Sequence, residues 1–269
     1  MVLKGNTTIT LLAGLLYSAG QVVSWERLVE WVWAADLPEH PRAALHNAVA
    51  RLRRALGTES IETTDWGYRF QVDSAELDLL RFDRLTALAA RLESVDRTAE
   101  AIAALDEAFA LWRTPLLGNV ESATLRSAVE PRLVDRYLAT VEARAALRLR
   151  TGRHNGLADE LAEVVRQHPF RETLVCWLMI ALVRTGRQTE ALAAYEALSR
   201  SLADELGIAP LAPLTGLRDQ ILRGEPVTDR LLLGSDHGAG QPGKPNPLAS
   251  TRVGEPKSPR RGDLNDHTT

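Results

Sequence analysis

The sequence predicts a mainly α-helical protein with two folded domains, and three observations favour this fold class. Residues 6–75 carry three short helical patterns and then the pattern of a β-hairpin. From Glu76 to about Glu225, apolar residues recur three and four positions apart between short breaks at Gly or Pro. Beyond that point the chain is rich in Gly, Pro, Ser and Asp and loses its periodic apolar residues. We therefore expect two domains and a disordered tail, at residues 1–75, 76–225 and 226–269.

Composition indicates a soluble chain without a membrane segment. The chain is 45% hydrophobic and 25% charged, and no apolar run approaches the ~20 residues that span a bilayer. No signal peptide opens it, so we expect a cytoplasmic protein. Cys176 is the single cysteine, and its surroundings, CWLMIAL, predict a buried thiol that forms no disulfide. The net charge of −3 does not itself indicate nucleic-acid binding, so any such function must depend on local charge.

The first two helices are expected at Ile9 to Ser18 and from Ser24 to about Ala34. The first is short and apolar. Ser24 is a favourable N-cap residue, and acidic residues follow it near the positive end of the second helix dipole. Pro38 and Pro41 then break the chain.

A third helix is expected from about Arg42 to Leu56, with two different faces. On a helical wheel its apolar face consists of Leu45, Val49, Leu52 and Leu56. The opposite side carries His46, Asn47, Ala50, Arg51 and Arg54, with Arg42 and Arg53 on its flanks. Such a helix fits a DNA major groove, where Arg and Asn pair with base edges and other arginines hold phosphates. The alternative is an ordinary solvated helix, and charge alone does not exclude it.

The segment IETTDWGYRFQV predicts a β-hairpin directly behind that helix. Tyr68, Phe70 and Val72 alternate with Arg69 and Gln71 after an expected turn at Asp65 to Gly67. Helix, helix, basic helix and hairpin is the order of a winged helix-turn-helix. The hairpin, as the wing, would bring Arg69 and Trp66 beside a minor groove or phosphate.

The second domain is expected to resemble tetratricopeptide helix pairs. RTGRHNGLADEL and RTGRQTEALAAY align with Gly152 and Gly186 separated by the 34 residues typical of that repeat. The template places small or large packing residues at several positions and a helix end at Pro169. These packing positions are Ala101, Leu105, Ala108, Leu161, Ala191 and Tyr195.

The order of these segments resembles one known family. Five segments of the N-terminal half are similar to the Streptomyces antibiotic regulatory protein (SARP) family: GQVVSWERLVEWVW, ALHNAVARLRRALG, IETTDWGYRF, ELDLLRFDRL and ALWR. The later stretch from LRLRTGRHNGLADEL to ADELGIAP is similar to the bacterial transcriptional activator domain of that family. The resemblance covers about residues 6–223. It implies an OmpR-type winged helix with Asn47, Arg51 and Arg54 on the recognition helix and Gly67 and Tyr68 in the wing.

The same resemblance implies a function and partners. Family members activate secondary-metabolite (antibiotic) gene clusters by binding direct repeats in double-stranded promoter DNA and recruiting RNA polymerase holoenzyme. We accordingly expect a protein at the bacterial nucleoid, without cofactor or membrane partner, and leave open a homodimer on the DNA. The chain departs from the family pattern in two ways: only Met1 to about Asn6 stand where members carry an N-terminal β-sheet, and Trp66 occupies a turn position usually held by a small residue.

Enzyme activity is not expected, and one other class of function stays open. Gly238, Gly243 and Lys244 have P-loop spacing, but Pro245 stands where Ser or Thr would bind magnesium. No catalytic constellation or metal-ligand spacing is evident. The competing hypothesis is a tetratricopeptide-like adaptor that acts by protein contacts and whose DNA-binding half is vestigial.

Overall fold

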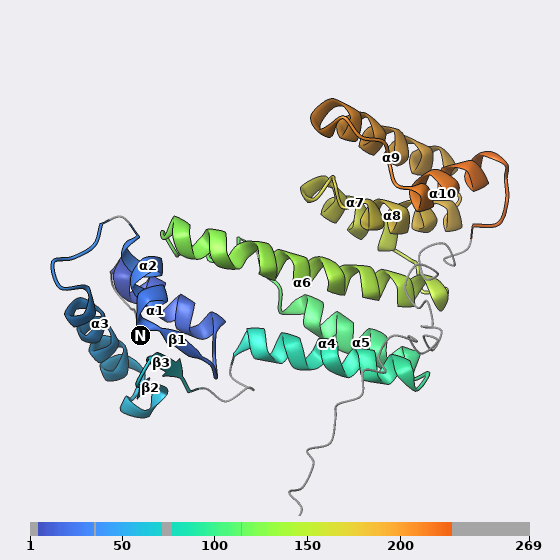
Figure 1. Ribbon diagram of the computed structural model, residues 1–269. Helices are drawn as coiled ribbons and strands as arrows, with labels where there is room; N and C mark the ends of the chain where they lie inside the picture. The colour runs from blue at the N-terminus through green and yellow to red at the C-terminus, as the bar shows by residue number, and fades with distance from the viewer. Residues whose placement is uncertain (1–4, 35, 72–76, 114, 228–269) are drawn as a thin grey trace, which may run out of the picture. The chain divides into compact units, whose positions relative to one another are not determined.

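The computed structural model describes residues 5–34, 36–71, 77–113 and 115–227 (Figure 1). These residues form a mainly α-helical protein with one three-stranded antiparallel sheet, as predicted. None of the helices in the described ranges is both long and apolar enough to cross a membrane. Val72, the P-loop-like glycines and the predicted tail from residue 228 lie outside the described residues.

Seven short elements form the N-terminal part of the chain. The first helix begins earlier than predicted, at Asn6, and Pro41 takes the first position of α3, where its missing N–H costs nothing. Ser24 caps α2 as predicted, since its side chain accepts a hydrogen bond from the Arg27 amide at 3.3 Å. The elements are α1 (Asn6–Tyr17), β1 (Val22–Ser24), α2 (Trp25–Trp33), α3 (Pro41–Leu56), the 3₁₀ turn η1 (Thr58–Ser60), β2 (Ile61–Thr64) and β3 (Gly67–Phe70).

The predicted hairpin is part of a three-stranded sheet in the order β1-β3-β2. The sequence did not indicate β1, which pairs Val23 with Tyr68 in antiparallel register. Gly67 lies against β1 so closely that a Cβ atom there would fall 1.9 Å from the Val23 carbonyl oxygen. Only glycine therefore fits at this position of the wing.

The apolar face of α3 forms most of the expected contacts. Leu45, Val49 and Leu52 are buried, as predicted. Leu56 is 37% exposed, so its assignment to the core face was wrong. Leu56 is the last residue of α3, and the chain turns away at Gly57, which has a φ of 101°. The turn explains why Leu56 is left partly uncovered.

Eight further elements follow in the C-terminal part. The turns at Gly152 and Gly186 both have positive φ, and the residue after each glycine donates to a carbonyl five positions back at 2.8 Å. The predicted spacing thus corresponds to two equivalent helix ends. The elements are α4 (Asp78–Ser94), α5 (Thr98–Ala110), α6 (Ala123–Arg150), α7 (Leu157–Gln167), α8 (Glu172–Arg184), α9 (Gln188–Ser201), the π-helical turn η2 (Leu202–Leu206) and α10 (Ala212–Leu222).

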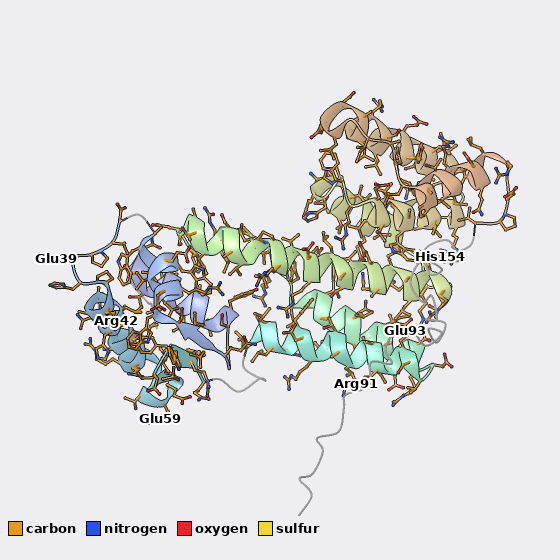
Figure 2. The ribbon with its side chains drawn as sticks, in the orientation of Figure 1. Glu39, Arg42, Glu59, Arg91, Glu93 and His154 are labelled. Atoms are coloured by element: carbon orange, nitrogen blue, oxygen red, sulfur yellow. The ribbon has the colours of Figure 1, made fainter. Side chains whose placement is uncertain are left out.

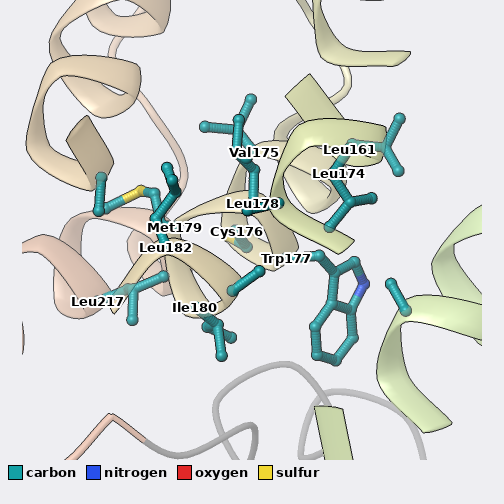
Figure 3. Packing of buried hydrophobic residues seen from close by; sticks show 14 of the residues in the cluster. Leu161, Leu174, Val175, Cys176, Trp177, Leu178, Met179, Ile180, Leu182 and Leu217 are labelled. Carbon is teal, nitrogen blue, oxygen red and sulfur yellow. The ribbon is translucent and has the colours of Figure 1, made fainter. Parts of the chain in front are cut away.

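Helix α8 is the centre of the C-terminal core (Figure 3). Cys176, Trp177 and Met179 are among its buried residues, and burial raises the pKa of the Cys176 thiol to about 12. The packing positions predicted from the repeat are buried as well. They are Ala101, Leu105, Ala108, Leu161, Ala191 and Tyr195.

The N-terminal half of α6 packs into the core of the winged-helix segment. Leu125, Val129 and Leu133 belong to the same apolar cluster as Leu11 and Trp31. Within this core, Gly14 of α1 allows the Trp31 ring of α2 to lie close to α1, because a Cβ atom at Gly14 would lie 2.7 Å from that ring. Two segments that look separate in the sequence therefore share one hydrophobic core.

Part of the apolar surface of α1 remains uncovered beside this core. Ile9, Leu12 and Leu16 are half-buried. With Phe82 and Trp112 they line a cavity of about 740 Å³ between α1, α4 and the segment before α6.

Candidate nucleic-acid interface

The outer face of α3 carries the polar residues that the sequence predicted. Asn47, Arg51 and Arg54 are exposed, and Ala50 is half-buried. Asn47, Arg51 and Arg54 follow one another at spacings of four and three, so they share one helix face and span about 10 Å along the axis. Their shared face has the dimensions of a helix surface that enters a DNA major groove.

This face is positively charged although the chain is acidic overall. Helix α3 has no acidic residue, and the nearest ones in the sequence, Glu39 and Glu59, lie beyond its two ends (Figure 2). Within the described part of the chain, no hydrogen bond or ion pair engages the side chains of Asn47 and Arg51. Arg54 makes one long bond, from Nε to the Ala50 carbonyl oxygen at 3.4 Å. These three side chains can therefore turn to a ligand at little cost.

Arg53, which the sequence predicts on the flank of the DNA-facing side, contacts the hairpin. Its Nε and Nη2 donate to the carbonyl oxygen of Ile61 at 2.9 and 2.6 Å. Nη2 also donates to Oγ1 of Thr63 at 2.7 Å. The side chain thus fastens β2 to α3, and no pattern in the sequence indicates this long-range contact.

Arg42 stands at the other end of α3, on an aromatic ring. Its guanidinium carbon lies 4.0 Å from the ring centroid of Trp25, the first residue of α2. This cation–π contact orients an exposed arginine beside the first turn of α3. Sequence reasoning identified Arg42 but missed Trp25, which precedes it by 17 positions and lies on another helix.

A second contact ties the hairpin to α3. Nδ1 of His46 and the hydroxyl oxygen of Tyr68 are 3.4 Å apart. Tyr68 is buried, which raises the pKa of its phenol, while nearby Arg53 lowers it by a smaller amount. The phenol therefore stays protonated at neutral pH and can donate to the imidazole.

The wing presents one large aromatic side chain and a neutralised cation. Trp66, in the two-residue turn between β2 and β3, is 80% exposed. Its carbonyl oxygen accepts a hydrogen bond from the Trp25 amide at 3.3 Å. Nη1 of Arg69 lies 3.2 Å from Oε2 of Glu62, and both side chains are partly exposed.

The structure thus groups the predicted site residues into three sets. Asn47, Ala50, Arg51 and Arg54 lie together on the outer face of α3, with Arg42 beside its first turn. His46 and Arg53 contact the hairpin. Trp66 and Arg69 belong to the wing itself.

Two family models together match residues 2–222 of the chain. The bacterial transcriptional activator domain matches residues 77–222. The C-terminal domain of transcriptional regulatory proteins matches residues 2–78. The first of these alone covers more than half of the chain.

Two relatives and one solved structure are similar to most of this chain. Regulatory protein DnrI of Streptomyces peucetius is 34% identical over 227 residues, which cover 80% of this chain and 84% of DnrI. Regulatory protein AfsR of Streptomyces griseus is 32% identical over 80% of this chain, but the match spans only 22% of AfsR. The structure of Mycobacterium tuberculosis EmbR, solved in complex with a low-affinity phosphopeptide, matches with a TM-score of 0.75 and 29% identity, covering 84% of this chain and 61% of EmbR.

Both domain matches and the DnrI relationship agree with the winged helix and helical array seen in the structure. The chain belongs to the Streptomyces antibiotic regulatory protein family of transcriptional activators.

Proposed function

We propose that the protein activates transcription by binding double-stranded promoter DNA, with α3 in the major groove. The observation that carries this proposal is the acid-free outer face of α3, on which Asn47, Arg51 and Arg54 are exposed. Arginine pairs with guanine edges and asparagine with adenine edges, which is how a helix in the major groove reads sequence.

The roles within this face follow from position and contacts. Asn47 and Arg51 stand in the middle of α3 and are assigned to base edges. Arg54 is in the last turn, and Arg42 is held beside the first turn on Trp25, so both are assigned to phosphates at the groove margins. Arg53 and His46 position the hairpin against α3 and are assigned no direct DNA contact.

We further propose that the genes activated form a secondary-metabolite (antibiotic) gene cluster. In this proposal the winged helix, residues 1–75, binds direct repeats near a promoter, and the helical array, residues 76–225, contacts RNA polymerase holoenzyme. Membership of the family supports this assignment. Tandem repeats would place two copies side by side, and we propose a homodimer that forms on DNA.

Selection of DNA from a random duplex library tests the proposal. We expect the full chain to enrich duplexes that contain a repeated element, and an Arg51→Ala, Arg54→Ala double variant to enrich none. Arg91→Ala removes an exposed arginine of α4 and is the matched control (Figure 2), expected to select as the unmodified chain does. Selected sites placed ahead of a core promoter should then raise transcription by purified RNA polymerase.

One outcome favours the competing function. If the folded chain enriches no duplex at low salt but still binds RNA polymerase, the DNA-binding proposal fails. The protein would then act as an adaptor through its helical array.

A further inference from the structure

The wing tip exposes a large apolar side chain that the fold does not use. Trp66 is 80% exposed, the highest value among the large hydrophobic residues of the described ranges. An aromatic side chain normally contributes to stability because folding buries roughly 150–250 Å² of its surface. An indole left in water therefore points to a use outside the fold.

The backbone beneath this side chain is firmly held. The Trp25 amide donates to the Trp66 carbonyl oxygen at 3.3 Å, and Oγ1 of Thr64 donates to the Gly67 carbonyl oxygen at 3.2 Å. Gly67 is packed against Val23 without room for a Cβ atom. The backbone of the turn is thus held in place, so a ligand that meets the indole does not have to order this backbone.

The wing tip, formed by Asp65 and Trp66, adjoins the face of α3 that we assign to DNA. Trp25 contacts the wing through its amide and contacts Arg42 through its ring. Arg53 joins α3 to β2. A duplex that receives α3 in its major groove therefore has an adjacent minor groove within reach of the wing.

Charge does not explain how the wing would hold DNA. Arg69 is the sole basic residue between Ile61 and Gln71, and it already pairs with Glu62 at 3.2 Å. Asp65, next to Trp66, is exposed and would repel phosphates. The attraction available at the tip is the apolar, polarisable face of the indole.

We propose that Trp66 inserts its indole into the minor groove and wedges against a base step. This proposal rests on the DNA-binding function proposed above. Apolar side chains act in this way by partly unstacking a step, which is easiest at pyrimidine–purine steps. The contact adds affinity without releasing counterions, so its contribution does not depend on salt. It also confers a preference for TA or CA steps at positions that α3 does not touch.

Duplexes selected by the full chain, carrying 2-aminopurine at successive positions, test this inference. We expect fluorescence to rise at one step beside each α3 site, because the base there unstacks. Trp66→Ala should abolish that rise and weaken binding about tenfold, with the slope of affinity against salt unchanged. Trp66→Phe should retain most of both effects, and Asp65→Asn, the matched change in the same turn, should keep the fluorescence signal. Melting temperatures should stay equal, since the replaced side chain is exposed.

Three outcomes would overturn the proposal, and each points to a different cause. If Trp66→Ala binds single sites as the unmodified chain does and loses only cooperativity on two-repeat duplexes, the tip docks on a second copy and the wedge is refuted. A salt slope that falls by about one unit in this variant would instead mean that a basic side chain has lost a phosphate contact, and would refute the wedge too. If the full chain selects no duplex, the DNA-binding function fails and the wedge fails with it.

Discussion

The hydroxyl of Ser122 donates a hydrogen bond to the backbone carbonyl oxygen of Trp31, 91 residues earlier in the chain. The hydroxyl oxygen of Ser122 also caps α6, because it accepts a hydrogen bond from the Leu125 amide at 3.1 Å. One side chain thus starts the long α6 helix and fastens it to the end of α2. The contact lies beside the core that α6 shares with the winged helix.

Loss of this hydroxyl should destabilise the protein more than loss of an ordinary helix cap. Ser122→Ala removes a cap, worth about 1 kcal/mol, and also leaves the Trp31 carbonyl without its partner. Ser24→Ala is the matched control, since Ser24 caps α2 alone. Urea unfolding of both variants compares them. A Ser122→Ala variant no less stable than Ser24→Ala would show that the contact to Trp31 adds nothing.

Gly67→Ala should disrupt the wing. The new methyl group would meet the Val23 carbonyl at 1.9 Å, so β1 and β3 have to separate. We expect a loss of about 1–3 kcal/mol of folding free energy, together with weaker DNA binding. Gly216→Ala in α10 is the control, because nothing lies within 4 Å of its Cβ position and alanine favours helix. Thermal melting that ranks the two variants equally would contradict this account of the wing.

Alanine variants of Arg53 and Arg51, which are two positions apart, should lose different properties. Arg53→Ala removes the hydrogen bonds to Ile61 and Thr63, so we expect the hairpin amides to exchange hydrogen faster and stability to fall by about 1–3 kcal/mol. Arg51→Ala should change stability by less than about 0.5 kcal/mol and act only on DNA affinity. Hydrogen exchange of residues 61–70 separates the two. Unchanged exchange in Arg53→Ala would exclude its anchoring role.

Cys176 should be chemically inert in the folded protein. It is 2% exposed, and its thiol has a pKa of about 12, so almost no reactive thiolate exists at mildly alkaline pH. We expect Ellman's reagent to titrate no thiol in the native chain and one thiol per chain in concentrated urea. Rapid labelling of the native protein would mean that α8 opens readily.

Local patterns in the sequence predicted much of the fold. The apolar period of α3, the Ser24 cap and the paired glycines at 152 and 186 depend on neighbours within a few residues. The prediction that Leu56 is buried was wrong because a helical wheel does not show where the helix ends.

The remaining features depend on residues far apart in the chain. Strand β1 consists of three residues and exists because β3 is available to pair with it. The bonds from Arg53 to the hairpin, the stacking of Arg42 on Trp25 and the bond from Ser122 to Trp31 join different elements. Composition and periodicity carry no information on such pairs, so the sequence does not indicate that Arg53 contacts the hairpin.

The most direct test of the central claim, that α3 binds DNA through its exposed arginines, is the salt dependence of binding to a selected duplex. For Arg54→Ala we expect the slope of log affinity against log salt to flatten by about one unit. For Arg51→Ala we expect a loss of about 1–3 kcal/mol and relaxed preference at one base pair. Arg91→Ala should match the unmodified chain. Affinity and slope unchanged in both Arg51→Ala and Arg54→Ala would contradict the assignment of α3 as the recognition helix.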